Sequence, residues 1–298
     1  MQLTLAWWNT ALSPTKRKNR GTPEEIGAAA AVIGRLIQAG ADLVALCEVT
    51  DQDLAGIERH LTATLDDFVI RRTQDKVGSS HFDTAVLHRK CLSLGKGQSV
   101  ARHQGARLLK AAQKFLLSLP DGSEIVLYVS HWPSRATLET PSRTILGDIL
   151  RGSIEDEMKE RPACSVVLLG DFNDEPFDPV MEQRLLSSRD KQLVKKKDYL
   201  LYNPFWRHMT TYRHGAREHQ FCDRGTYFHA NGPVTKWRTF DQMMFSASLV
   251  SGKAGWQLDE TATRVFDDPE MGNLVLTRKN VFDHLPIVGR LISSISDE

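Results

Sequence analysis

The chain has 298 residues, and its 38 lysines and arginines are balanced by 37 aspartates and glutamates, so the formal net charge is only +1. This balance excludes a uniformly basic protein that coats nucleic acid. The content of 41% hydrophobic and 25% charged residues is typical of globular proteins and excludes a chain that is disordered throughout.

The first elements predicted along the chain are a strand, a helix, a second strand and a second helix. Residues 3–8 form a short apolar run that ends at Asn9, which predicts a buried strand leading into a loop. In residues 22–25 a threonine can cap a helix, a proline suits its first position and a glutamate completes a capping box. Gly40 predicts the end of this helix. A strand over 43–47 and helical spacing over 54–65 follow.

The middle and the end of the chain predict mainly strands, separated by turn residues. The helices expected there cover 140–160 and a short segment that starts at Asp178-Pro179. The expected strands cover 68–72, 83–88, 114–119, 124–130, 165–169, 225–229, 240–246 and 285–288. The strands before and after Pro120-Asp121-Gly122 should form a hairpin. Because we find no internal repeat, low-complexity segment or linker, we expect one domain over residues 1–298.

The location of the protein is predicted from its N-terminus and its cysteines. No basic segment precedes the first apolar run, and no apolar stretch is long enough to cross a bilayer. The four cysteines are scattered in the sequence and lie mostly in apolar runs, as buried thiols do. We therefore expect a cytoplasmic protein without a membrane partner.

Polar residues stand at or just beyond the ends of the predicted strands. In layered α/β proteins such side chains project into a common crevice, so residues far apart in the sequence can meet there. The residues in question are Asn9, Glu48, His131, Asp171, Asn173, Asp241, Asp283 and His284.

The chemistry of this set points to a divalent cation and a phosphate ester. Carboxylates and amides dominate it, without a thiol or a run of imidazoles, and such ligands prefer Mg²⁺ or Mn²⁺ to zinc. A cation held by one or two carboxylates is the usual partner of phosphate oxygens, and two histidines can move protons or stabilise developing charge. The set therefore predicts phosphoester hydrolysis.

Six short motifs, taken in order, resemble those of the endonuclease/exonuclease/phosphatase superfamily. They span residues 8–288, nearly the whole chain, and are Trp8-Asn9, Leu46-Cys47-Glu48, Ser130-His131-Trp132, Leu169 to Asp174, Phe240 to Ser246 and Asp283-His284-Leu285-Pro286. The resemblance implies an α/β (α+β) fold, a four-layer sandwich of two packed, mainly antiparallel β-sheets flanked by helices.

The resemblance also implies a role for each residue of the set. Glu48 would be the principal metal carboxylate, with Asn9 close to it and to the scissile phosphate, and Asp283 would lie near the metal.

On the side of the attacking water, Asp171 would orient or deprotonate the nucleophile, and Asn173 would donate a hydrogen bond to the phosphate. His284 would contact the phosphate, with Asp241 accepting from its other ring nitrogen. His131 would lie on the side of the leaving group.

Two features concern the surroundings of these motifs. Phe282 stands where the family usually has a serine, which removes a hydroxyl but neither catalytic group. Arg135 and Arg143 follow His131 and would bind substrate phosphates beyond the scissile one, as would the basic residues at 16–18 and 20 after Asn9. Solvated loop charge explains these basic residues equally well.

The interpretation that we favour is a Mg²⁺- or Mn²⁺-dependent phosphodiester hydrolase, a nuclease whose substrate is DNA or RNA. The first alternative is a phosphomonoesterase that acts on a phosphorylated metabolite or an inositol phosphate. A lipid phosphodiesterase ranks below it, because no amphipathic anchor is evident. An alternative of another class is a catalytically silent binding module. The complete set of carboxylates and imidazoles argues against this alternative.

Overall fold

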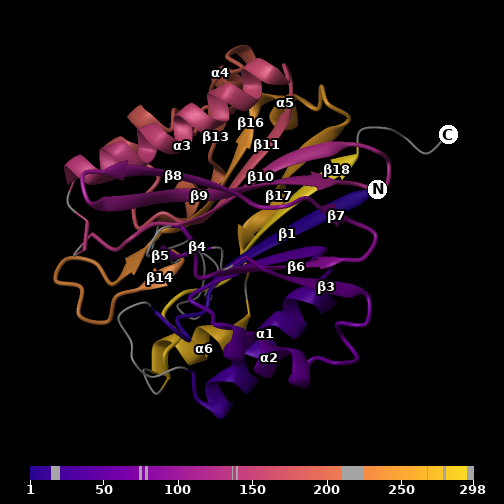
Figure 1. Cartoon of the computed structure of the whole chain (residues 1–298), viewed down its shortest axis with the longest axis vertical. Helices are drawn as coiled ribbons and strands as arrows, with labels where there is room; N and C mark the ends of the chain where they lie inside the picture. Colours follow the sequence, from indigo (N-terminus) through magenta and orange to yellow (C-terminus); the bar gives the residue numbers. More distant parts are fainter. Residues whose placement is uncertain are drawn as a thin grey trace, which may run out of the picture.

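The structure is a computed structural model that describes residues 1–14, 21–73, 76–77, 80–135, 137–138, 140–209, 225–266, 268–277 and 280–293. Two large sheets pack face to face, and helices cover their outer faces, which gives four layers (Figure 1). Most neighbouring strands within each sheet run antiparallel. The predicted α/β sandwich is therefore confirmed.

The first sheet contains the N-terminal and C-terminal strands side by side. Its order is β17 (Trp256–Val265), β18 (Ile287–Ser293), β1 (Gln2–Asn9), β2 (Leu43–Cys47), β6 (Thr84–Arg89) and β3 (Phe68–Arg72). Only β1 and β2 of this order pair in parallel.

The second sheet is built mostly from the middle of the chain. Its order is β12 (Ser187–Ser188), β13 (Leu201–Tyr202), β16 (Asp241–Ser246), β11 (Ser165–Asp171), β10 (Glu124–His131), β9 (Arg107–Ser118) and β7 (Ser93–Leu94), and β8 (Gln98–Gln104) also pairs with β9. The two central strands β10 and β11 run parallel. Two small ribbons, β4 (Lys76–Val77) with β5 (Ser80–His81) and β14 (Tyr227–Phe228) with β15 (Trp237–Arg238), complete the strands described.

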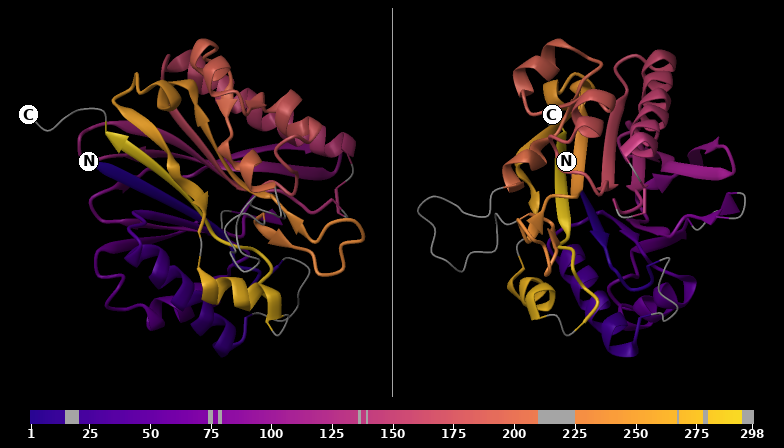
Figure 2. Two further views of the ribbon diagram at one scale, coloured as in Figure 1. Left: turned by 180° about the vertical axis from the view of Figure 1, so that it is seen from behind. Right: turned by 90° about the vertical axis from the view of Figure 1, so that its left-hand side faces the viewer.

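The helices divide between the two outer layers, as the views in Figures 1 and 2 show. On the side of the first sheet lie α1 (Pro23–Gln38), α2 (Asp51–His60) and α6 (Pro269–Thr277). On the side of the second sheet lie α3 (Thr140–Glu160), α4 (Lys191–Lys196) and α5 (Ala247–Ser251). The predicted capping box of α1 is confirmed, because Thr22 and Glu25 exchange side-chain to backbone hydrogen bonds. No helix within the described ranges is long and apolar enough to span a bilayer.

The core explains why the central strands have continuous apolar sequences. β1 is covered by the second sheet on one face and by helices on the other, so nearly all of its side chains are buried. A second cluster fills the space between α3 and the outer face of the second sheet. These strands are consequently fixed on both faces, and so are the polar residues at their ends.

Some predicted elements differ in extent or type. The helix expected over 54–65 is Asp51–His60, because Thr50 caps it and Asp53 completes a second capping box. The short helix expected after Pro179 is a π-helix, Val180–Arg184. We did not predict β8, β17 or α6.

Candidate active site

The topology places the polar strand ends at one edge of the sandwich. In the first sheet, the parallel pair β1 and β2 ends with Asn9 beside Cys47, and Glu48 follows directly. In the second sheet, the register of β10 and β11 sets His131 beside Asp171. Parallel strands end at the same edge, so each sheet contributes side chains to one place.

A cavity of about 570 Å³ lies at this edge. The predicted site residues that line it are Asn9, Glu48, His131, Asp171, Asn173, Asp283 and His284. The structure thus brings together residues from the two ends of the sequence, from Asn9 to His284. Asp241 does not line the cavity but lies behind His284, with which it forms a hydrogen bond.

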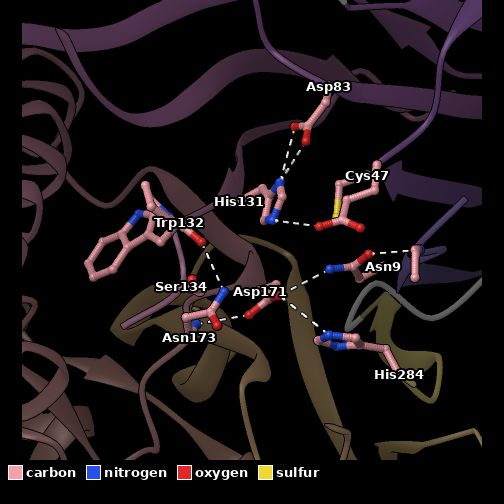
Figure 3. A network of polar contacts seen from close by, with 12 residues as sticks. Asn9, Cys47, Asp83, His131, Trp132, Ser134, Asp171, Asn173 and His284 are labelled. Atoms are coloured by element: carbon pink, nitrogen blue, oxygen red, sulfur yellow. Dashed lines mark hydrogen bonds and ion pairs between the residues drawn. The ribbon is translucent and has the colours of Figure 1, made fainter. Parts of the chain in front are cut away.

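Asp171 is at the centre of the network drawn in Figure 3 and is only 1% exposed. Its Oδ2 atom accepts a hydrogen bond from Nδ2 of Asn9 at 3.1 Å and lies 3.7 Å from Nε2 of His284. Its Oδ1 atom accepts from the backbone N–H of Asn173 at 2.8 Å. Burial raises the pKa of Asp171, although the nearby His284 opposes the shift. This carboxylate is therefore a better proton acceptor than an exposed aspartate.

Gly170 lets β11 approach β10 at this point. A Cβ atom at position 170 would lie 2.1 Å from the carbonyl oxygen of Ser130, a separation that no side chain tolerates. The glycine before Asp171 is therefore required by the close pairing of the two parallel strands.

His284 is held by a buried carboxylate. Its Nδ1 atom donates to Oδ2 of Asp241 at 2.7 Å, and the other oxygen of Asp241 accepts from the indole N–H of Trp7 at 2.7 Å. Burial lowers the pKa of His284, but Asp241, Asp171 and the hydrogen bond outweigh this effect and raise it to about 10. The ring is therefore an imidazolium at neutral pH.

Phe282 has a packing role next to the site. Its ring lies 5.5 Å from that of Trp8, and the indole N–H of Trp8 donates to the backbone oxygen of His284 at 3.1 Å. The aromatic pair thus fixes the segment that carries Asp283 and His284.

His131 is held in a similar way by Asp83, which we did not predict as a site residue. Its Nδ1 atom lies 3.1 and 3.0 Å from the two carboxylate oxygens of Asp83, and its Nε2 atom lies 3.5 Å from Oε1 of Glu48. Burial lowers the pKa of His131, but the two carboxylates and Asp171 raise it to about 10. The site therefore contains a second imidazolium, paired like the first.

Glu48 and Asp283 are the carboxylates best suited to hold a cation. Burial raises the pKa of Glu48 to about 7, and it also raises the pKa of Asp283. Among the described residues, Oδ1 of Asp283 is buried and has no hydrogen-bond partner. A buried carboxylate oxygen without a hydrogen bond, in a cavity that Glu48 also lines, fits a hard divalent cation.

Another set of possible ligand atoms lies within 4.8 Å of one another, on Asp171, Asp241 and His284. Both oxygens of Asp241, however, accept hydrogen bonds from Trp7 and His284. This set therefore orients His284, and Glu48 and Asp283 are other carboxylates of the cavity that could hold a cation.

Two residues of the site have the left-handed backbone conformation that favours glycine. The φ angle is 56° at Glu48 and 51° at Asn173. Strain of this kind persists where the surrounding structure fixes it and is common at functional sites. The side-chain N–H of Asn173 donates to the carbonyl of Trp132 at 2.9 Å, which links the two strand ends.

Tyr227 was also not predicted as a site residue. It lines the cavity, and its ring lies 4.6 Å from that of His284. Burial raises the pKa of Tyr227 to about 12, so its hydroxyl remains a hydrogen-bond donor at neutral pH.

Arg135 and Arg143 do not line the cavity, contrary to expectation. Arg143 is 4% exposed, and its guanidinium donates to Asp174 and to the carbonyl oxygens of Pro133 and Phe172. Its donors are thus used within the protein, which corrects its predicted role as a phosphate ligand.

Arg135 is half-exposed and pairs with Asp174 and Asp178, beside the cavity rather than in it. The basic residues predicted to border the cleft at 16–18 and 20 lie outside the described residues.

The sequence contained one signal for Asp83 that we did not use. Asp83 directly precedes a buried strand, so it follows the same rule of polar residues at strand ends. Tyr227 carries no such signal, because it belongs to a two-residue strand whose position depends on the bridge that it forms with His284.

Residues 14–276 match the model of the Endonuclease/Exonuclease/phosphatase family. No curated protein sequence matches the chain.

Several solved structures share the fold along almost the full length. Truncated TDP2 from Caenorhabditis elegans has 16% sequence identity and a TM-score of 0.60, with 98% of each chain covered. An endonuclease/exonuclease/phosphatase family protein from Bacteroides thetaiotaomicron has 13% identity and a TM-score of 0.63, again with 98% of each chain covered. The mannosyl-6-phosphatase of the same species has 13% identity and a TM-score of 0.62, over 97% of this chain and 99% of that one. At these identities the likeness shows the fold.

Proposed function

Because the chain belongs to the endonuclease/exonuclease/phosphatase family, we propose that it is a divalent-metal-dependent phosphodiester hydrolase, a nuclease that acts on DNA or RNA. One observation carries this proposal. A single cavity contains two carboxylates suited to a cation, a buried carboxylate with a raised pKa and two imidazoles that are each paired with an aspartate.

In this proposal Glu48 and Asp283 would hold Mg²⁺ or Mn²⁺, and Asn9 lines the same cavity. When bound, the cation would neutralise charge on the phosphate oxygens. The orphaned oxygen of Asp283 and the raised pKa of Glu48 support this assignment.

Asp171 orients the attacking water and accepts its proton. Its raised pKa supports this role, and the hydrogen bonds from Asn9 and Asn173 fix the direction of its carboxylate. The primary amide of Asn173 carries two N–H protons, of which one is directed to Trp132 and the other can be donated to a phosphate oxygen.

The two imidazolium groups have different roles in this proposal, and Figure 3 shows both of them near Asp171. His284 stabilises the charge that develops on the phosphate, and Asp241 keeps its ring in place. His131 supplies a proton to the departing oxygen, and Asp83 holds its ring as Asp241 holds that of His284.

A phosphomonoesterase is the second candidate, and the size of the cavity favours it. Its volume of about 570 Å³ falls in the range of small-molecule sites. One structural relative is named as a mannosyl-6-phosphatase.

The proposed activity is tested with a panel of DNA, RNA, nucleotides and inositol phosphates, each with Mg²⁺, Mn²⁺ or EDTA. We expect cleavage of DNA or RNA that EDTA abolishes and that is lost in Asp171→Asn and His284→Ala proteins. Asp66→Asn, at an exposed position beyond α2, is the matched control. Release of inorganic phosphate without shortening of a polymer would favour the phosphomonoesterase instead, and cleavage that persists in both variants would remove these residues from the mechanism.

We also propose that residues 1–298 act as one domain and that the protein works in the cytoplasm. The pairing of β1 with β18 and the shared core support a single domain, and the free thiols of Cys47, Cys91 and Cys164 suit a reducing compartment. Limited proteolysis that yields no stable fragment would agree with the first proposal, and fractionation of cells tests the second.

A further inference from the structure

One wall of the cavity is formed by the first residues of β9, which pairs with β8 in a hairpin. Arg107 and Lys110 of β9 both line the cavity that contains Asp171 and His284. Nζ of Lys110 lies 5.1 Å from the centre of the ring of Phe82, the residue before Asp83. Burial lowers the pKa of Lys110, and the carboxylate of Asp83 opposes this shift. Lys110, a basic residue of this wall, therefore lies close to the pair formed by Asp83 and His131.

The charge of this hairpin contrasts with that of the cavity floor. Residues 98–110 include two arginines, a lysine and a histidine but no acidic residue. Arg102, His103 and Arg107 are exposed, and the register places Arg102 beside Leu109 and His103 beside Leu108. The floor, in contrast, presents the carboxylates of Glu48, Asp83, Asp171 and Asp283. A polyanion would be attracted to the hairpin and held off the floor, except where a cation is bound.

The guanidinium of Arg107 is positioned at the rim. Its Nη2 atom donates to the carbonyl oxygen of Thr137 at 3.1 Å, which ties it to the loop that follows His131. A guanidinium has five N–H protons, so this contact leaves donors for a phosphate.

The positively charged side chains of Arg107 and Lys110 come from positions three residues apart on β9. Strand residues advance by about 3.3 Å each, so the backbone of Arg107 lies about 10 Å from that of Lys110, farther from the reacting centre. A substrate with a single phosphate bound between Asp171 and His284 would leave Arg107 without an anionic partner, whereas the next phosphates of a strand would lie along the hairpin.

We propose that the β8–β9 hairpin binds the backbone phosphates of a polynucleotide on the side of the leaving group, with Arg107 as the residue that determines this specificity. The inference rests on the proposed hydrolase function. It adds the surface that would bind the strand and a residue that would distinguish a strand from a metabolite with one phosphate.

The test compares a long substrate with a short one in the full-length protein. We would measure kcat/KM for a DNA strand of about 20 nucleotides and for bis(p-nitrophenyl) phosphate, a small diester without further phosphates. In Arg107→Ala the ratio of the two kcat/KM values should fall about tenfold, because a charge-assisted hydrogen bond to the strand is lost. Arg107→Lys, which retains the charge, should recover part of the ratio. Lys159→Ala, at an exposed position of α3, is the matched control and should leave the ratio unchanged.

Binding gives a second readout that does not depend on turnover. Fluorescence anisotropy of the labelled strand, single or duplex, would be recorded at several salt concentrations with the Asp171→Asn protein. Adding Arg107→Ala or Arg102→Ala should weaken binding of the strand. Each should also reduce the slope of log K against log salt by about the amount expected for the loss of one phosphate contact.

The outcomes separate this inference from the proposed function. A protein that hydrolyses the small diester but does not bind DNA, or a ratio that is unchanged in Arg107→Ala, would overturn the role of the hairpin and leave the hydrolase intact. A protein that hydrolyses neither substrate with Mg²⁺ or Mn²⁺ would overturn both.

Discussion

Nδ1 of His284, which lines the cavity, lies 2.7 Å from a carboxylate oxygen of Asp241, which is buried behind it. The carboxylate is itself fixed by the indole N–H of Trp7. The orientation and the charge of the imidazole at the cavity wall are therefore set by a residue that does not reach the cavity.

Replacing Asp241 tests this relationship. In Asp241→Asn the imidazole would lose its anionic partner, so kcat should fall about a hundredfold or more while the fold persists. Steady-state kinetics with the small diester measure the effect. Asp148→Asn, at an exposed position of α3, should retain normal kcat.

The second prediction concerns the pKa of His131. Asp83 and Glu48 hold it near 10, above the value of about 6.5 for an unfolded chain. The pair should therefore stabilise the folded state fully below about pH 6.5, and its contribution should disappear as the pH rises through 10. NMR titration of the metal-free protein measures the pKa, and Asp83→Asn should lower it. An imidazole that titrates near its ordinary value in the unsubstituted protein would contradict the assignment.

The third prediction concerns the metal ligand. Glu48→Gln should weaken Mg²⁺ binding by at least about tenfold, because the neutral amide replaces a carboxylate of the site. Isothermal titration calorimetry measures the affinity, and Glu58→Gln on the exposed face of α2 is the control. Equal affinities for the two variants would place the cation elsewhere.

The fourth prediction concerns Arg143, which joins two loops of the site. Its removal would leave the buried carboxylate of Asp174 without its main partner, so Arg143→Ala should lower the free energy of unfolding by about 3–5 kcal/mol. Arg184→Ala removes an exposed ion pair with Asp148 and should cost less than about 1 kcal/mol. Urea denaturation compares the two, and similar losses would argue against a special role for Arg143.

The fifth prediction compares Gly170 and Gly152, which differ in the space available for a Cβ atom. Gly170→Ala should destabilise the protein strongly and reduce activity, because its Cβ would overlap the carbonyl oxygen of Ser130. Gly152→Ala lies in α3 with open space around the new methyl group and should stabilise the helix by up to about 1 kcal/mol. Thermal unfolding of both variants measures the difference in sign.

The central strands and the residues at their ends could be predicted, because a strand that is buried on both faces has a continuous apolar sequence that ends at a polar residue. β2 was predicted with its observed bounds, since an apolar run that stops at a charged residue has a single interpretation. The edge strand β17 was missed, because it alternates between buried and partly exposed positions and includes a bulge between Asp259 and Arg264.

The contacts of Asp83 with His131 and of Arg143 with Asp174 could not be predicted for a different reason. Each depends on a partner far away in the chain, 48 residues for Asp83 with His131 and 31 for Arg143 with Asp174. In the sequence, a carboxylate before a strand and an arginine in a helix are both compatible with solvent exposure. Only the packing of the sheets and of α3 assigns their contacts.

The hydrogen bonds of the site have a mechanical consequence. Asn9 with Asp171, Trp7 with Asp241 and His131 with Asp83 each connect a residue of one sheet to a residue of the other. A small sliding of the two layers would break all three at once, before any strand or helix unwinds. Enzymatic activity should therefore depend on the alignment of the two sheets. Under mildly denaturing conditions it should be lost while the circular dichroism of the helices is still native.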